Sequence, residues 1–297
     1  FYLAIGASAG RKLGVEGEDA KGVILGVDFL KDVALERSEP LHGNVIVIGG
    51  GNVAIDVART AVRCGAQTVN MYSLEQRAEM PALEEEIEEA ESENVVINNG
   101  YGPKRIVVEN GKVVGVEFKK CVSVFNAEGK FAPKYDENDT VIVPADFVLV
   151  SIGQKIEWGN LLDGTNVKLN KNNTVAVDEF YVTGDKNIIA GGDCVTGPAS
   201  AIRAIAAGKV AAANIDEHLG FRHEIKVELD IPAPRLNNRA PHGRINTTER
   251  EACERRCDFE DIECGLTEEG ARTEASRCLR CDHYGYGIFR GGRNEKW

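Results

Sequence analysis

The sequence predicts an α/β fold in which short buried strands alternate with helices. Residues 45–48 (VIVI) form an apolar, β-branched run, as expected of a parallel strand that is buried on both faces. A glycine-rich turn at 49–54 and a helical stretch at 55–64 follow directly, and Gly65 is suited to end that helix. A second strand is predicted at 68–72. The order strand, turn, helix, strand is typical of a βαβ unit.

The glycine-rich turn has the sequence GGGNVA, which fits the pattern G-x-G-x-x-G/A. In this pattern Gly49 allows the tight turn, Gly51 lets a pyrophosphate approach the backbone, and Ala54 lets the helix pack closely on the strand. The positive end of the helix dipole then faces the phosphates. Ordinary strand–helix connections also contain glycines, but here every flanking element is where the motif requires it. We therefore predict a dinucleotide site whose turn comprises Gly49, Gly50, Gly51, Asn52 and Val53.

An acidic residue just past the second strand bears on the choice of dinucleotide. Glu75 lies 24 positions after Gly51, where a carboxylate can receive the adenine-ribose hydroxyls of NAD and would repel a 2′-phosphate. Arg77 follows two residues later and could pair with such a phosphate, so the signal is mixed. We predict that Glu75 and Arg77 line the cofactor site and that NAD(H) is favoured over NADP(H). The alternative is that Glu75 is a solvated surface residue.

Composition excludes several classes of partner. The net charge of −12 opposes non-specific binding to nucleic acids, which depends on Lys and Arg. No apolar run approaches the length of a membrane span. The sequence starts at Phe1, and residues 1–5 are typical of a buried strand, so we expect the chain to begin inside a domain, without a signal peptide. These observations predict a cytoplasmic protein with no nucleic-acid partner and no membrane span.

The 297 residues are enough for two domains. A further apolar strand at 147–152 ends at Gly153, as the first strand ends at Gly6, and two such turns suggest that the chain crosses twice between a nucleotide-binding domain and a host domain. Between the crossings we expect a β-meander with strands at 105–108, 113–118 and 122–125. We predict five segments: a host-domain part (1–43), the nucleotide-binding domain (44–145), a second host-domain part (146–220), a linker (221–250) and a cysteine-rich tail (251–297).

Several motifs stand together in one order. They are the strand and helix within 1–30, GGGN at 49–52, EMPA at 79–82, SIGQ at 151–154 and GGD at 191–193. In this order they resemble the glutamate synthase small-subunit family of flavin oxidoreductases, a branch of the two-dinucleotide-binding-domain flavoproteins, over about residues 1–220. The resemblance implies a Rossmann-like NAD(P)-binding domain inserted in an FAD-binding domain, with hydride passing from nicotinamide to flavin.

The resemblance also implies where FAD would lie. Asp193 would hold a ribityl or pyrophosphate oxygen, and the backbone near Ala199 and Ser200 would face the flavin ring and stabilise charge on the reduced form. Since the cofactors carry the chemistry, no catalytic side chain is expected. The other residues that we expect to line the cofactor sites are Gly6, Ile152, Gly153, Gln154 and Gly192.

Two departures from the family pattern matter. The strand–glycine fingerprint that binds the ADP half of FAD would lie upstream of Phe1, so we expect a partial FAD-binding domain whose adenosine half-site comes from a partner or another segment. Family members that favour NADP carry paired arginines after the second strand, where Leu74 and Glu75 stand here. This difference supports NAD(H).

Five of the eight cysteines crowd the tail in the pattern C-x3-C-x6-C-x13-C-x2-C. Four thiolates suit a [4Fe–4S] cluster or zinc. The spacing matches neither common ferredoxin pattern, but residues 274–281 (EASRCLRC) resemble the opening of the family's cluster segment. We favour an iron–sulfur centre, with zinc and free or disulfide-bonded thiols as alternatives. The candidate ligands are Cys253, Cys257, Cys264, Cys278 and Cys281.

These features together favour an electron-transfer flavoenzyme subunit. It would pass a hydride from NAD(P)H to FAD and relay electrons through the tail to an electron-accepting protein or subunit. One alternative is a non-catalytic NAD-binding scaffold whose tail holds structural zinc or docks a partner. Another is a thiol–disulfide reductase that uses Cys278 and Cys281, although no helix clearly opens at the first of these cysteines.

Overall fold

The computed structural model describes residues 1–223 and 248–265. The chain divides into two units, Phe1–Glu224 and Ile225–Trp297, and each is described by itself. Within the described ranges, none of the helices has both the length and the apolar character needed to cross a membrane. Most of the predicted linker 221–250 lies outside the described residues, as do Cys278 and Cys281.

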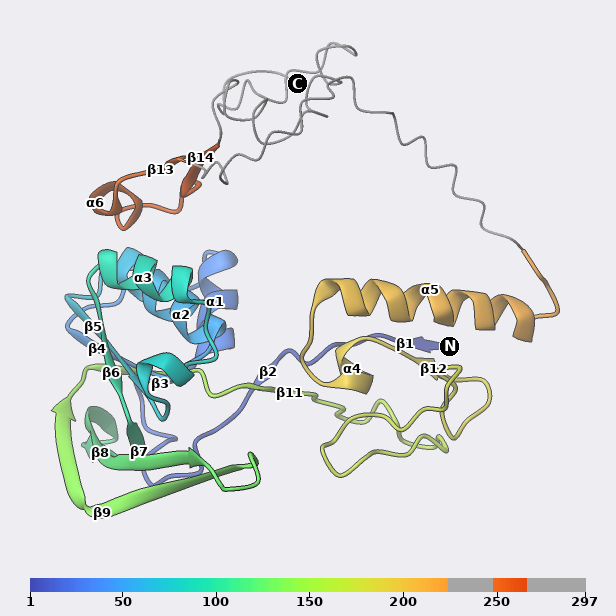
Figure 1. Ribbon diagram of the computed structural model, residues 1–297, viewed down its shortest axis with the longest axis horizontal. Coiled ribbons are helices and arrows are strands. Elements are labelled where there is room, and N and C mark those ends of the chain that lie inside the picture. Colours follow the sequence, from blue (N-terminus) through green and yellow to red (C-terminus); the bar gives the residue numbers. More distant parts are fainter. Residues whose placement is uncertain (224–247, 266–297) are drawn as a thin grey trace, which may run out of the picture. The chain divides into compact units, whose positions relative to one another are not determined.

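The first unit contains a five-stranded parallel sheet with the strand order β3-β10-β4-β5-β6. Its strands are β3 (Val23–Leu25), β4 (Asn44–Ile48), β5 (Thr68–Ser73), β6 (Val95–Asn99) and β10 (Phe147–Val150). Figure 1 shows three helices on one face of the sheet, namely α1 (Gly26–Ala34), α2 (Asn52–Arg63) and α3 (Glu84–Ser92). The opposite face carries the meander. The predicted βαβ unit is thus β4-α2-β5, and Gly65 has the positive φ of +97° expected after the helix.

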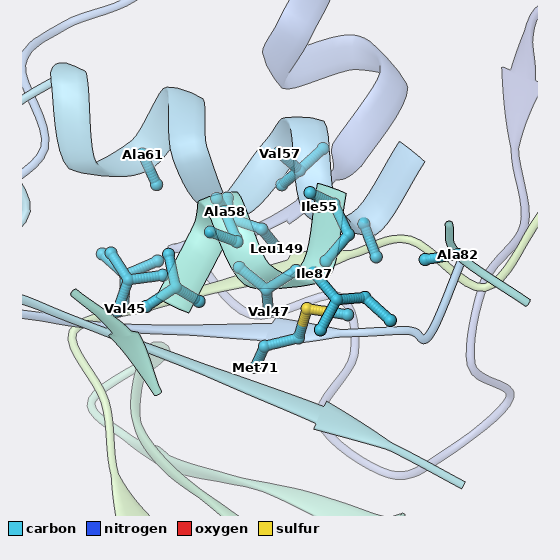
Figure 2. Close-up of a cluster of buried hydrophobic side chains, with 14 of the residues drawn as sticks. Val45, Val47, Ile55, Val57, Ala58, Ala61, Met71, Ala82, Ile87 and Leu149 are labelled. Atoms are coloured by element: carbon cyan, nitrogen blue, oxygen red, sulfur yellow. The ribbon is translucent and has the colours of Figure 1, made fainter. Parts of the chain in front are cut away.

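Strand β4 contributes to two hydrophobic cores. Val45 and Val47 point toward the helices and pack in one cluster with Ile55 of α2 (Figure 2). Ile46 and Ile48 belong to a second cluster, formed with the meander. Because successive side chains of a strand point to opposite faces, burial on both sides requires the uninterrupted apolar run seen in the sequence.

The meander is a three-stranded antiparallel sheet with the order β7-β8-β9. Its strands are β7 (Tyr101–Glu109), β8 (Lys112–Phe125) and β9 (Phe131–Pro144). Asn110 and Gly111 form the hairpin turn between β7 and β8, and both have the positive φ that a two-residue turn of this kind requires. The predicted strands 113–118 and 122–125 are one continuous strand, β8. The prediction missed β9, because its middle is polar and largely exposed.

The chain enters and leaves this part of the fold through two paired strands. β2 (Ala9–Gly10) pairs antiparallel with β11 (Gln154–Lys155), and the N–H of Arg11 donates to the carbonyl of Gly153 at 3.1 Å. The two crossings therefore run side by side. Because β3 and β10 are hydrogen-bonded into the sheet of β4, the predicted borders at 43/44 and 145/146 fall inside the sheet.

The remainder of the first unit is built on β1 (Tyr2–Leu3), which pairs in parallel with β12 (Ile189–Ala190). The short helix α4 (Asp193–Thr196) and the long helix α5 (Ala201–His218) follow. The sequence predicted a buried first strand, but Phe1 is 93% exposed and Ile5 is 40% exposed. The strand forms, but no other strand in the described residues pairs with this two-stranded sheet.

The described part of the second unit is small. β13 (Thr248–Glu249) pairs antiparallel with β14 (Glu263–Gly265), with α6 (Ala252–Arg255) between them. Both terminal nitrogens of Arg250 donate to the carboxylate of Asp258 at 2.8 Å, which ties the connection together.

Candidate functional site

The candidate nucleotide site lies where the strand order of the parallel sheet reverses. From β4 the chain moves outward to β5 and β6, and later returns to the other side of β4 as β10. Ligands of open α/β sheets bind at such a switch point, outside the carboxyl ends of the strands. Gly49 follows β4 and Ser151 follows β10, and a Cβ on Gly49 would collide with the carbonyl oxygen of Ser151. Glycine is therefore required at this position, because the backbone segments that follow β4 and β10 approach each other closely.

The rest of the glycine turn leaves room for a ligand at one position. Gly51 precedes α2 with an extended backbone (φ −97°), and a Cβ built there would meet no atom within 4 Å. The helix begins at Asn52, three residues earlier than predicted, so the first N–H groups of α2 lie in the turn itself. The N–H of Ala54 donates to the carbonyl of Gly51 at 2.8 Å, which leaves the N–H groups of Asn52 and Val53 to face a ligand. Together with the helix dipole, they make the turn an anion-binding feature.

A loop after β5 is attached to this turn. The N–H of Ala82 donates to the carbonyl of Gly50 at 3.2 Å, and the N–H of Leu83 donates to Oδ1 of Asn52 at 3.0 Å. The other end of the Asn52 side chain donates to Glu86 at 3.4 Å. The side chain of Asn52 therefore holds the loop, a role that the motif did not predict. The EMPA sequence was the signal available, because its Ala82 makes one of these contacts.

The side chain of Glu75 lies against the turn at Gly50. Its Oε2 atom would be 2.6 Å from a Cβ on Gly50. The carbonyl of Glu75 accepts hydrogen bonds from Ser73, Asn99 and Gly100 at 3.0–3.1 Å, so the backbone that carries this carboxylate is well fixed. Burial raises the pKa of Glu75 above its ordinary value, and the nearby charge of Glu79 acts in the same direction.

Arg77 lies in the short 3₁₀ helix η1 (Arg77–Glu79) and is paired with α3. Its Nη1 donates to Glu91 at 2.6 Å, and its Nη2 and Nε donate to Glu84 at 2.9 and 3.3 Å. That Arg77 lines the cofactor site stays a prediction. In the structure its guanidinium is bound to two carboxylates of the protein, and sequence reasoning missed these contacts.

A second glycine-rich turn follows β12. A Cβ on Gly191 would collide with the hydroxyl of Tyr2, and Gly192 has a φ of +73°. Asp193 accepts the N–H of Ala199 at 3.2 Å, and Ser200 is the first residue before α5. The structure thus brings together the three residues that the resemblance assigns to FAD. Gly6 follows the neighbouring strand β1, and a Cβ on it would meet no atom within 4 Å.

The remaining predicted cofactor residues lie at the crossing. Gly153 has a φ of +114°, and Gln154 is the first residue of β11, where its carbonyl accepts Nε of Arg11 at 2.8 Å. Ile152 is 42% exposed beside the switch point. Sequence reasoning did not single out Ser151, whose buried hydroxyl has no hydrogen-bond partner among the described residues.

The predicted metal ligands are described only in part. Cys253 and Cys257 are exposed, and Cys257 Sγ donates to the carbonyl of Cys253 at 3.2 Å. Cys264 lies in β14, and Cys278 and Cys281 lie outside the described residues. In the ranges 1–223 and 248–265 no three acidic, histidine or cysteine side chains are grouped to hold a metal ion. The cluster therefore stays a prediction.

Solved structures with the same fold are two-dinucleotide-binding flavoproteins. Mycobacterium tuberculosis FprA in complex with NADPH matches with a TM-score of 0.61 and 18% identity over 76% of this chain and 66% of that chain. Thioredoxin reductase of T. acidophilum matches with a TM-score of 0.56 and 21% identity over 73% and 65% of the two chains. At this level of identity the likeness shows the fold.

Sequence relatives are closer. The beta subunit of the NADP(+)-dependent formate dehydrogenase of Moorella thermoacetica is 35% identical over 98% of this chain and 43% of its own length. The small chain of Escherichia coli glutamate synthase [NADPH] is 32% identical over 72% of this chain and 49% of its own. The chain thus spans about half the length of these relatives, and the predicted resemblance to the small-subunit group is confirmed. The profile of the pyridine nucleotide-disulphide oxidoreductases matches residues 2–208, and the chain belongs to that family.

Proposed function

We propose that this chain is part of an electron-transfer flavoenzyme subunit that takes a hydride from NAD(P)H to FAD and passes electrons to an iron–sulfur centre or a partner subunit. One observation carries the proposal. Two parallel-strand pairs, β4–β10 and β1–β12, each end in glycine-rich turns that open a helix, and one paired crossing joins them. A protein that only binds NAD needs just the first of these turns.

The residues at the first turn fit a dinucleotide. The space above Gly51 is open, and the N–H groups at the start of α2 are positioned to donate to a pyrophosphate. The carboxylate of Glu75 stands beside the turn, where it can accept hydrogen bonds from ribose hydroxyls. When bound, NAD(P)H supplies the hydride, and the protein supplies orientation and electrostatics.

We further propose that NADH is the preferred coenzyme. The half-buried Glu75 carboxylate would meet a 2′-phosphate with like charge, and hydrogen bonds from Ser73 and Asn99 fix the backbone that carries it. The two relatives named above carry NADP(+) or NADPH in their names. A preference for NADH would therefore distinguish this chain from them.

The residues at the second turn fit the ribityl and flavin portion of FAD. The backbone at Gly6 and Gly192 is not covered by neighbouring atoms, so a ligand can approach it closely. Asp193 accepts a hydrogen bond from the N–H of Ala199 and so fixes the loop that leads into α5. The apolar side chains of Ile202 and Ile205 on α5 are 78% and 59% exposed beside the sheet of β1 and β12. We propose that further polypeptide, from the same protein or a partner, covers this face and completes the FAD site. The relatives' greater length agrees with that proposal.

The test is an anaerobic visible spectrum of the purified assembly, in which this chain is joined by the polypeptide that completes the FAD site, with iron and zinc analysis of the same sample. Flavin absorbance that bleaches on addition of NADH, with stoichiometric iron, is the expected result. NADH binding without flavin, together with zinc or no metal, would favour the scaffold alternative. Bound flavin that NADH does not reduce in the completed assembly would contradict hydride transfer.

A further inference from the structure

The pairing of Arg77 points to a control of coenzyme choice that lies outside the nucleotide turn. Arg77 follows Glu75 by two residues and is the only cation in residues 73–79. Three of its nitrogens donate to Glu84 and Glu91, which stand two helical turns apart on α3. Both edges of the guanidinium are therefore occupied by carboxylates.

These ion pairs lie at the surface, where they contribute little to the free energy of folding. The Arg77 side chain is 36% exposed, and those of Glu84 and Glu91 are 61% and 44% exposed. Exposed ion pairs of this kind have little effect on stability, because water and salt screen them. A stabilising role therefore does not account for two carboxylates on one arginine.

The two glutamates change the charge that this loop presents. Without the two glutamates, Arg77 would place a planar cation two residues from Glu75, and such a fork is well suited to bind a phosphate. With them, the group of three carries a net charge of −1 by simple addition of one cation and two anions. The guanidinium of Arg77 is therefore hydrogen-bonded by carboxylates, and the negative charges of the group exceed its positive charge.

On the basis of the proposed nucleotide site, we propose that Glu84 and Glu91 are specificity-determining residues. They engage Arg77 so that its guanidinium is not available to the 2′-phosphate of NADP(H). The carboxylate of Glu75 selects for ribose hydroxyls from within the turn, and the α3 glutamates remove the cation that would oppose this selection.

The test uses the full chain and direct binding of NADH and NADPH by calorimetry. The variant E84Q/E91Q should bind NADPH about tenfold more tightly than the unmodified protein, with NADH affinity changed less than about twofold. The matched control is E85Q/E88Q, which removes the same charge from exposed positions of the same helix and should change either affinity less than about twofold. Adding R77A to E84Q/E91Q should abolish the gain.

Each other outcome has a distinct meaning. An equal gain in the control pair would show a general charge effect and overturn the inference, as would no gain in E84Q/E91Q or a gain that survives R77A. If the folded protein and all variants bind neither coenzyme, the proposed nucleotide site itself fails. That result is separable from a failure of the inference, in which NADH still binds.

Discussion

Gly51 differs from the other two glycines of the nucleotide turn in what surrounds it. A Cβ on Gly49 would strike the backbone of Ser151, and one on Gly50 would approach the Glu75 carboxylate. At Gly51 the backbone is extended and the space is empty. The fold therefore has room for a side chain at this position, but that side chain would clash with a ligand bound over the turn.

Gly51→Ala should separate binding from stability. We expect NADH affinity to fall about tenfold or more, because the methyl group occupies the space through which a pyrophosphate approaches. The free energy of unfolding should change by less than about 1 kcal/mol, as for other cap substitutions. Calorimetry and urea denaturation measure the two quantities.

The matched control is Gly208→Ala, which adds a methyl group to open space in helix α5. It should leave NADH affinity unchanged and raise the free energy of unfolding by about 0.5–1 kcal/mol, the usual gain in a helix. Unchanged NADH binding in Gly51→Ala would remove Gly51 from the proposed site.

The raised pKa of Glu75 predicts a pH-dependent coenzyme preference. As the pH falls through this pKa, the carboxylate is neutralised at a higher pH than an ordinary glutamate, whose value is 4.5. The ratio of NADPH to NADH affinity should therefore rise on mild acidification. Glu75→Gln should show a high ratio at every pH. Binding titrations of both coenzymes across the acid range test this, and a flat ratio in the unmodified protein would contradict it.

At this scale the sequence specified the positions of the turn but not the partners of its side chains. The fit to G-x-G-x-x-G/A depends on local spacing, and the structure reproduces the strand, turn and helix that it requires. The contacts of Asn52 with Leu83 and of Arg77 with Glu91 join separate elements. They depend on how α3 packs, which no local pattern contains.

At the scale of elements, α2 and α3 are joined by a buried charge cluster. Glu93 caps α3 with a fully buried side chain, and within the described residues both Arg59 and Arg63 of α2 donate hydrogen bonds to its carboxylate at 2.6–3.1 Å. Burial alone would raise the pKa of Glu93, but the hydrogen bonds from the two arginines outweigh it and lower the pKa. The cluster fixes the helix that carries Glu84 and Glu91.

Glu93→Gln should destabilise the protein by about 3 kcal/mol, because it leaves buried arginine charge without its partner. The control Glu88→Gln, on the exposed face of α3, should change stability by less than about 0.5 kcal/mol. Urea denaturation measures both.

The sign of the pH dependence follows from the lowered pKa. The contribution of Glu93 is complete above its unfolded value of 4.5 and is lost as the pH falls toward its folded value. The difference between the unmodified protein and Glu93→Gln should therefore shrink in acid. A difference that does not depend on pH would mean that packing, not charge, stabilises this junction.

The elements that sequence reasoning found and missed differ in how much they are buried. β4 and β10 were predicted because both faces of each strand are packed, so their residues are almost entirely apolar, and β5 was predicted from the apolar residues that it contributes to both cores. β9 was missed because much of it faces water and carries polar residues such as Glu137 and Asn138. Its place in the meander comes from pairing with β8, a long-range interaction that a local pattern does not reveal.

At the scale of the whole molecule, the exposed apolar face of α5 should matter for flavin and not for folding. The double variant I202S/I205S should change the free energy of unfolding by less than about 0.5 kcal/mol per site, since both side chains are largely exposed. It should lower the FAD content of the assembled protein while NADH affinity stays the same.

The control for that experiment is Ile142→Ser, at a position of β9 that is 58% exposed and belongs to the meander. It should leave FAD content unchanged. Unaltered FAD content in I202S/I205S, measured by absorbance after purification of the assembly, would mean that this face does not complete the flavin site.

The five predicted segments stay a prediction. Glycines that follow strands indicated crossings at Gly6 and Gly153, but the apolar strands on the two sides of a predicted border look alike in sequence. The sequences of apolar strands such as β3 and β10 do not indicate which sheet the strands belong to. That is determined by the hydrogen bonds that they form with neighbouring strands.

The pairing of β2 with β11 has an evolutionary consequence. Because Gly10 and Gln154 are direct neighbours in that pair, the intervening chain begins and ends at nearly the same point in space. A segment with adjacent ends can be gained, lost or exchanged in one recombination event, with little entropic cost to the protein that receives it. Residues 11–153 therefore have the geometry of a segment that recombination could replace as one piece, without changes to the strands on the other side of this pair.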